Sequence, residues 1–201
     1  MTNINWDIDF FFNPQDPANP FPTSGIPIPT YGNYGGADYS AGKIGGTTPE
    51  PSALTPKPVD QLDGLFYLHD LAYQHVHDGV APPSSIPYAD AALIAGMGDL
   101  KYTDPGSRYY DPEAGLYEGV AVFGITLKLE TELAGAGTNL KSFLTTLPHQ
   151  EQADFIHAIF EAPVNVAAGL EHLPRGEVGE ATSLLSALHL PLHSAQNFLH
   201  V

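Results

Sequence analysis

The stretch from residue 58 to residue 73, PVDQLDGLFYLHDLAY, most constrains how this chain can fold. Asp60, followed three residues later by Asp63, is typical of a helix N-terminus. Apolar residues then recur at helical spacing, and one face of the helix shares Leu62, Phe66, His69, Tyr73 and Val76. We therefore expect a helix over residues 60–78, ended by Gly79, whose apolar face carries an imidazole and a phenol.

The spacing within this helix also predicts two chemical groups on adjacent faces. Asp70 follows His69 directly and projects about 100° around the helix axis from it. A histidine turned to the interior could act as a base that activates water, while the neighbouring carboxylate holds a cation. A histidine on an apolar helix face is more often a core residue with satisfied hydrogen bonds. The interpretation therefore depends on the rest of the chain.

A second predicted helix, over residues 86–99, contains an acid that needs a partner. Asp90 lies on its apolar face together with Leu93, Ile94 and Met97. A carboxylate in such a stripe is costly unless it is paired, and helices joined by a short turn pack antiparallel. We therefore expect Asp90 to contact His69 and fix its tautomer, with Tyr73 donating a hydrogen bond to Asp90.

Residues 31–46 form a segment in which glycine is interspersed with tyrosine. Glycines permit turns in which successive carbonyl oxygens point at a hard cation such as calcium. A flexible linker is the alternative interpretation, although tyrosine rings favour packing. The segment is not a nucleotide loop, because it lacks the Gly-Lys-Ser/Thr ending and no apolar strand leads into it.

Composition narrows the classes of protein that this chain can belong to. Its 201 residues indicate one domain, or one domain with an appendage, and include 23 acidic and 7 basic residues for a formal charge of −16. That balance argues against nucleic acid as a partner and against electrostatic docking to anionic membranes, and it suits a cation-binding protein. There is no cysteine, so disulfides and thiolate chemistry are excluded.

The remaining segments are predicted from prolines and apolar periodicity. Residues 1–30 are rich in proline and aromatics, and we expect an extended arm over the core, with a lipid-facing rim as the alternative. Asp111–Pro112 is interpreted as a turn. A helix is expected over residues 116–134, and shorter helices follow, separated at Pro148, Pro163, Pro174–Gly176 and Pro191, over residues 139–147, 149–161, 164–173 and 178–189.

Taken together, these motifs resemble the secreted phospholipase A2 superfamily. The calcium loop of that family reads Tyr-Gly-Cys-Tyr-Cys-Gly, and residues 31–36 read YGNYGG. Its active helix reads Pro-x-Asp-x-Leu-Asp-x-Cys-Cys-x-x-His-Asp-x-Cys-Tyr, and residues 58–73 match it without a gap at Pro58, Asp60, Leu62, Asp63, His69, Asp70 and Tyr73. A second family helix brings an Ala-Asp or Cys-Asp carboxylate to the histidine, as Ala89–Asp90 would here. The resemblance covers residues 28–100 and does not extend beyond residue 135.

The resemblance implies a mainly α fold: two antiparallel core helices with a Gly-rich calcium loop, plus a C-terminal helical extension. The implied divisions are an N-terminal arm of residues 1–30, a catalytic core of residues 31–135 and an extension of residues 136–201 packed on the core.

The resemblance also implies an enzyme that uses calcium to hydrolyse the sn-2 ester of glycerophospholipids at a membrane or micelle surface. Its catalytic residues would be His69, which draws a proton from water, Asp90, which orients His69, and Tyr73. Calcium would be held by Asp70 and by the loop carbonyls at Tyr34, Gly36 and Asp38, and the Gly36 N–H would stabilise the oxyanion.

The sequence departs from the family pattern at the family's cysteines, at one loop position and by an insertion. Its cysteines are replaced at Asn33, Gly35, Leu65, Phe66 and Ala72, as in the disulfide-free viral and bacterial branches. Leu65 and Phe66 indicate that apolar packing joins elements that disulfides would join. Asp38 stands where the family has glycine, and residues 43–57 form an insertion, which costs little loop entropy.

Two alternatives accompany this interpretation. One is a catalytically silent, calcium-dependent lipid-binding or toxin module. The other is a zinc site of His69, His75 and His77, which is disfavoured because the last two project about 200° apart on a helix. The N-terminus lacks a secretory signal pattern. We therefore expect a secreted protein that uses another export route, and a cytoplasmic location is compatible with the same residues. Protein partners are not predicted.

Overall fold

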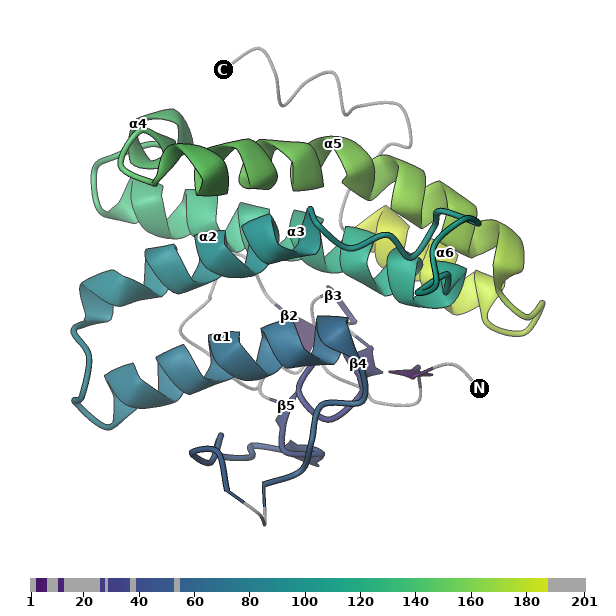
Figure 1. Ribbon diagram of the computed structural model, residues 1–201, viewed down its shortest axis with the longest axis horizontal. Coiled ribbons are helices and arrows are strands. Elements are labelled where there is room, and N and C mark those ends of the chain that lie inside the picture. Colours follow the sequence, from purple (N-terminus) through teal and green to yellow (C-terminus); the bar gives the residue numbers. More distant parts are fainter. Residues whose placement is uncertain are drawn as a thin grey trace.

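The computed structural model describes residues 3–6, 11–12, 26–27, 29–36, 39–52 and 55–187. Within these residues the fold is mainly helical, as expected from the sequence. The helices are α1 (Gln61–His77), the short 3-10 helix η1 (Pro83–Ser85), α2 (Ile86–Met97), α3 (Pro112–Gly135), α4 (Leu140–Leu144), α5 (His149–His172) and α6 (Val178–Ala187). Figure 1 shows α1 and α2 side by side and running in opposite directions, with α3 and α5 packed beyond α2.

Local signals at both ends of α1 explain its boundaries. The Asp60 side chain accepts a hydrogen bond from the Asp63 N–H at 2.9 Å and caps the first turn. At the other end Gly79 has a φ of +72°, and its N–H bonds to the Val76 carbonyl at 3.1 Å. A glycine takes this left-handed conformation without strain. The helix predicted over residues 60–78 is therefore confirmed.

α3 begins earlier than the sequence analysis expected. Asp111 and Pro112, interpreted above as a turn, start the helix: the Asp111 carboxylate accepts the Ala114 N–H at 3.1 Å, and Pro112 takes the first helical position. Proline is favoured there because its missing N–H would have no partner within the helix. The helix then continues to Gly135, one residue beyond the predicted end.

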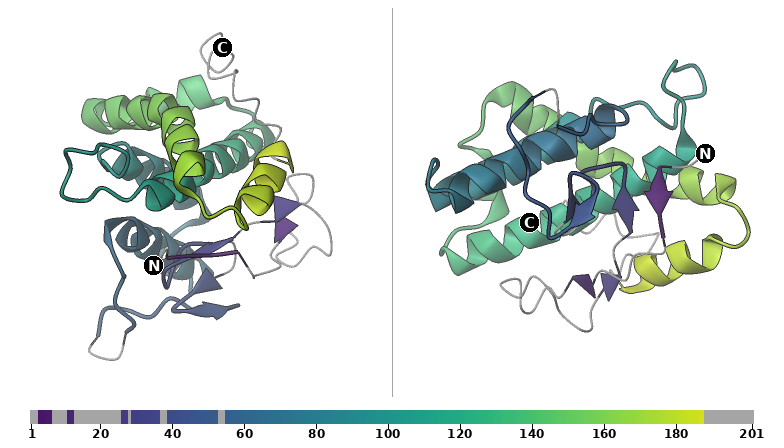
Figure 2. Two further views of the ribbon diagram at one scale, coloured as in Figure 1. Left: turned by 90° about the vertical axis from the view of Figure 1, so that its right-hand side faces the viewer. Right: turned by 90° about the horizontal axis from the view of Figure 1, so that it is seen from below.

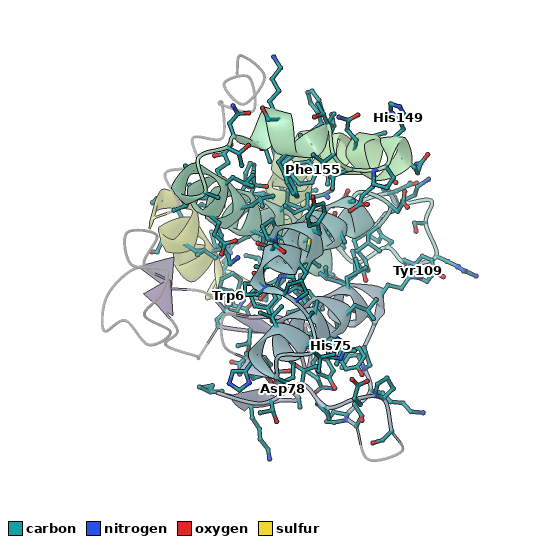
Figure 3. The ribbon with its side chains drawn as sticks, turned by 90° about the vertical axis from the view of Figure 1, so that its left-hand side faces the viewer. Trp6, His75, Asp78, Tyr109, His149 and Phe155 are labelled. Carbon is teal, nitrogen blue, oxygen red and sulfur yellow. The ribbon has the colours of Figure 1, made fainter. Side chains whose placement is uncertain are left out.

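α5 corrects the prediction of two helices broken at Pro163. The helix runs from His149 to His172 with Pro163 in its interior. A proline inside a helix costs about 3 kcal/mol when no other interaction offsets it. Here buried residues fix the helix on both sides of the proline, with Phe155 before it and Val166 after it. Figure 3 shows Phe155 pointing from α5 into the interior.

Close backbone contacts at glycines bring α5 against its neighbours. A Cβ at Gly119 of α3 would lie 2.6 Å from the Ala162 carbonyl of α5, and one at Gly98, just after α2, would lie 2.5 Å from the Asp154 carbonyl. Larger residues at these positions would force the helices apart. The same packing continues to α6, whose Leu184 joins the buried cluster around Val166 and Leu116.

Short antiparallel strand pairs complete the described fold. β1 (Ile4–Asn5) pairs with β4 (Thr30–Tyr31), β2 (Phe11–Phe12) with β3 (Ile26–Pro27), and β5 (Tyr39–Ser40) with β6 (Lys43–Ile44). Figure 2 shows β1 and β4–β6 beside α1, with β2 and β3 near α6.

The described part of the N-terminal arm lies over the core, as the favoured interpretation predicted. Ile4 is buried, and Trp6 packs against both apolar clusters of the molecule. The side chains of Phe10, Phe11, Phe12 and Phe21, which the prediction also concerned, lie outside the part of the chain that is described. Among the described helices, none is both long and apolar enough to cross a membrane.

Candidate active site on α1, α2 and α3

The structure brings His69, Tyr73 and Asp90 together at the contact between α1 and α2. The Nε2 atom of His69 lies 2.8 Å from Oδ1 of Asp90, and the Tyr73 hydroxyl donates to the same oxygen at 2.8 Å. The imidazole and phenol rings pack with their centroids 4.5 Å apart. Asp90 itself is fully buried. The predicted contacts of Asp90 with His69 and with Tyr73 are therefore present.

A fourth residue of this network, Lys128 of α3, was missed by the sequence analysis. Its Nζ lies 2.7 Å from Oδ2 of Asp90 and also contacts the Tyr73 hydroxyl. Glu132, one helical turn further on, binds the same ammonium group at 2.6 Å. The available signal was that Lys128 is the single basic residue of α3, four residues before a glutamate.

Electrostatics keep Asp90 ionised despite its burial. Desolvation raises the pKa of this carboxyl, but the hydrogen bond from His69 and the positive charge of Lys128 outweigh it and hold the pKa below its usual range. An ionised carboxylate only accepts hydrogen bonds. The neutral imidazole must therefore carry its proton on Nε2, which leaves the Nδ1 lone pair available as a base.

His69 and Asp70 meet on the other side of the imidazole. Burial lowers the pKa of His69, but the nearby carboxylates of Asp70 and Asp90 outweigh it and raise the pKa above its ordinary value. Nδ1 of His69 lies 3.6 Å from Oδ1 of Asp70, which is an ion-pair distance and too long for a direct hydrogen bond. Nδ1 thus faces a carboxylate without being hydrogen-bonded to it.

One carboxylate oxygen of Asp70 has no partner among the described residues. Its Oδ2 atom is buried and has no hydrogen-bond partner within the described residues. Burial raises the pKa of Asp70, while the nearby His69 imidazole and Ser40 hydroxyl lower it. An unpartnered buried carboxylate oxygen is costly. A hard cation is one ligand that would satisfy it.

The glycine loop is attached to α1 through Asp63. This buried carboxylate accepts the N–H groups of Asn33 at 3.0 Å, Tyr34 at 2.7 Å and Val59 at 2.9 Å. Gly32 has a φ of +55°, and a Cβ there would lie 2.5 Å from the Asp63 carboxyl carbon. Only glycine therefore suits this close approach. Asp63 thus fixes the loop against the first turn of α1.

The predicted calcium ligands of the loop are described only in part. Tyr34 is buried, and its hydroxyl donates to the Pro56 carbonyl at 2.6 Å. Gly36 has a φ of +144°, and its carbonyl accepts the Tyr39 N–H at 3.4 Å. Asp38 lies outside the described residues. Burial raises the pKa of Tyr34, and the charges of Tyr67, Asp63 and Asp70 raise it further.

The histidines of the zinc alternative have separate partners. His69 binds Asp90, whereas His75 pairs with Glu50 at 2.7 Å and His77 with Asp78 at 3.0 Å. His75 and Asp78 lie toward the C-terminal end of α1 (Figure 3). In the part of the chain with described coordinates, no three His, Cys, Asp or Glu side chains gather as a metal cluster.

Comparisons of the chain with protein-family models, with curated proteins and with solved structures found no match. The functional assignment therefore depends on the geometry of these residues and on the sequence motifs.

Proposed function

We propose that this protein is a calcium-dependent phospholipase A2, a carboxylic ester hydrolase that cleaves the sn-2 ester of glycerophospholipids. The observation that carries the proposal is the orientation of His69. Its Nε2 is bound to the buried, ionised Asp90 at 2.8 Å, and its Nδ1 faces Asp70. An oriented neutral imidazole with a ring nitrogen that is not hydrogen-bonded can act as a general base toward water.

The chemistry assigned to the chain is a proton relay through His69. Nδ1 takes a proton from a water molecule as the water oxygen attacks the ester carbonyl carbon, and Asp90 stabilises the imidazolium that forms. The resulting tetrahedral intermediate collapses with cleavage of the bond to the glycerol oxygen. The imidazolium returns its proton to that leaving oxygen, which gives a lysophospholipid and a fatty acid. Tyr73 supports Asp90 throughout through its hydrogen bond.

The proposed calcium ligands are Asp70 and the carbonyl groups of the glycine loop. The unpartnered Oδ2 of Asp70 is a hard anionic donor, and the loop carbonyls of Tyr34, Gly36 and Asp38 are neutral oxygen donors of the kind that calcium accepts. When bound, calcium supplies positive charge that polarises the ester carbonyl. The Gly36 N–H is proposed to donate to the developing oxyanion.

Packing at the positions of the missing family cysteines supports the finer fold assignment. A Cβ at Gly96 of α2 would lie 2.7 Å from a methyl carbon of Leu65, and one at Gly35 of the loop would lie 2.9 Å from the ring of Phe66. Leu65 and Phe66 thus fasten α1 to α2 and to the loop. We propose a phospholipase A2-like core in which these contacts replace disulfides.

The limited exposure of His69 favours a second candidate function. Only 15% of its side chain is exposed, and a covered base would suit a catalytically silent, calcium-dependent lipid-binding or toxin module. Both candidates share a lipid surface as partner. Both also suit a location outside the cell, reached without a classical signal peptide, where calcium is abundant.

Hydrolysis of phosphatidylglycerol or phosphatidylcholine vesicles, with calcium or with a chelator, tests the proposal. We expect release of lysophospholipid and fatty acid that requires calcium and falls about 100-fold or more in His69→Gln, because the base is lost. His149→Gln, a change at an exposed histidine, is the matched control and should retain the parent rate.

The outcomes separate the candidates. Calcium-dependent vesicle binding without any hydrolysis would favour the silent module. Hydrolysis that survives the chelator, or that His69→Gln leaves intact, would contradict the proposed mechanism.

A further inference from the structure

The Asp90 carboxylate is held from opposite ends by different helices. Its Oδ1 accepts hydrogen bonds from His69 and Tyr73 of α1, and its Oδ2 binds Lys128 of α3 at 2.7 Å. The carboxylate can therefore neither rotate nor tilt without losing one of these contacts. Lys128 is in turn held by Glu132 at 2.6 Å, so the cation has a fixed position rather than a flexible one.

The positive charge at Oδ2 also determines which hydrogen bond Asp90 can make. Asp90 is fully buried, and a buried carboxyl without a cation beside it favours the neutral, protonated form. A protonated Asp90 would donate its hydrogen to Nε2 of His69. The imidazole proton would then reside on Nδ1, and the base nitrogen would be blocked.

We propose that Lys128 is a positioning residue of the active site, which keeps Asp90 an acceptor and thereby keeps Nδ1 of His69 free to take a proton from water. This inference rests on the proposed function for its catalytic consequence, but its effect on the imidazole can be measured without turnover. Lys128 contacts Asp90, Tyr73 and Glu132, and does not itself touch the reacting atoms.

The charges of the groups around His69 and Asp90 indicate why Lys128 is the residue proposed for this role. From α1, His69 faces Asp70 and Tyr73, and from α2 it faces Asp90. From α3, Lys128 binds Asp90, and Glu132 binds Lys128. Among these groups Lys128 alone carries a positive charge. Its removal therefore takes away the positive charge that lies 2.7 Å from Oδ2 of Asp90.

The test compares Lys128→Met, which removes the charge, with Lys128→Arg, which retains it. Lys141→Met, at an exposed lysine of α4, is the matched control. The first measurement is the ¹⁵N chemical shifts of the His69 ring at a pH where the ring is neutral, assigned by their loss in His69→Gln. We expect the Nε2–H tautomer in the parent, in Lys128→Arg and in Lys141→Met, and a shift toward the Nδ1–H tautomer in Lys128→Met.

The second measurement is vesicle hydrolysis with calcium. We expect Lys128→Met to lower kcat about 10- to 100-fold, a range typical of residues that orient a functional histidine, with KM unchanged within about twofold. Lys128→Arg should recover part of the loss. Should Lys128→Met fail to fold, Lys128→Gln takes its place in both measurements, because it removes the charge and retains an N–H donor.

A folded charge-free variant that retains the Nε2–H tautomer overturns the proposal, whatever its activity. Failure of the proposed function is a different result: a parent that hydrolyses no lipid, while the tautomer still depends on Lys128. In that case the role of Lys128 in orienting His69 stands and the lipase assignment falls.

Discussion

At the scale of single residues, three carboxylates on α1 and α2 have different partners and therefore different uses: Asp63 and Asp90 are buried, and Asp70 is partly buried. Asp63 accepts hydrogen bonds from three backbone N–H groups and fixes the glycine loop. Asp90 accepts hydrogen bonds from His69, Tyr73 and Lys128. Asp70 differs because its Oδ2 has no partner among the described residues. A buried carboxylate whose oxygens are all hydrogen-bonded contributes to structure, whereas an unpartnered oxygen needs an explanation, and a bound cation is the one proposed for Asp70.

Asp70→Asn tests this distinction through calcium binding. We expect calorimetry to detect calcium binding in the parent and not in the variant, since a neutral amide oxygen is a weaker ligand. At 100 times its Kd, calcium should stabilise the parent by about 2.7 kcal/mol and leave the melting temperature of the variant unchanged. Without calcium, the variant should be at least as stable as the parent, because burial penalises the ionised carboxyl and raises its pKa.

Asp99→Asn, at an exposed position, controls for the loss of one negative charge and should bind calcium as the parent does. Parent-like calcium affinity in Asp70→Asn would remove Asp70 from the site.

At the scale of elements, local signals predicted the helices near the site better than the later ones. α1 has its cap, its apolar stripe and its terminal glycine within its own sequence, and α2 follows by a short turn. α5 could not be predicted in the same way. α5 stays helical across Pro163 because it packs against α3 and α2 at Gly119 and Gly98, which are far away in the sequence.

The contact between α3 and α5 can be measured with two glycines of the same helix. Gly119→Ala should destabilise the protein by about 1–3 kcal/mol, because its Cβ would meet the Ala162 carbonyl at 2.6 Å. Gly124→Ala meets no atom within 4 Å and should stabilise the protein by about 0.5–1 kcal/mol through helix propensity. Urea unfolding gives both values, and equal effects of the two substitutions would show that the helices are not in close backbone contact.

At the scale of the whole molecule, stability should depend on pH through buried acids. Burial raises the pKa of Glu118 to about 9, against an ordinary value of 4.5, and the hydrogen bond from Asn165 offsets only part of that effect. Between these values the folded state holds a proton that the unfolded state releases. The stability contributed by Glu118 is therefore complete below about pH 4.5 and decreases as the pH rises toward 9.

Glu118→Gln removes this dependence because the amide stays neutral. The free energy of unfolding of the parent should fall relative to the variant by at most about 1.4 kcal/mol per pH unit across this range. Denaturant unfolding at several pH values measures the difference. A constant difference between pH 5 and pH 9 would show that Glu118 titrates normally.

Apart from the resemblance to family motifs, the candidate site could be predicted from the sequence only where a residue contradicted its surroundings. His69 and Asp90 interrupt apolar stripes, so each required a partner and the other was at hand. Lys128 does not interrupt an apolar stripe that can be recognised from the sequence. Its contact with Asp90 depends on how α3 is rotated relative to α2. That rotation is set by long-range packing, which a pattern along one helix does not contain.

The close packing of Leu65 on Gly96 and of Phe66 on Gly35 affects the redox conditions under which this fold can form. Apolar contacts form as soon as the two surfaces meet. Unlike disulfides, they require no oxidant, no isomerase and no particular redox potential of the glutathione pool. Maturation of the region around His69 is thus uncoupled from thiol chemistry, and reducing and oxidising surroundings are equally permissive for these 201 residues.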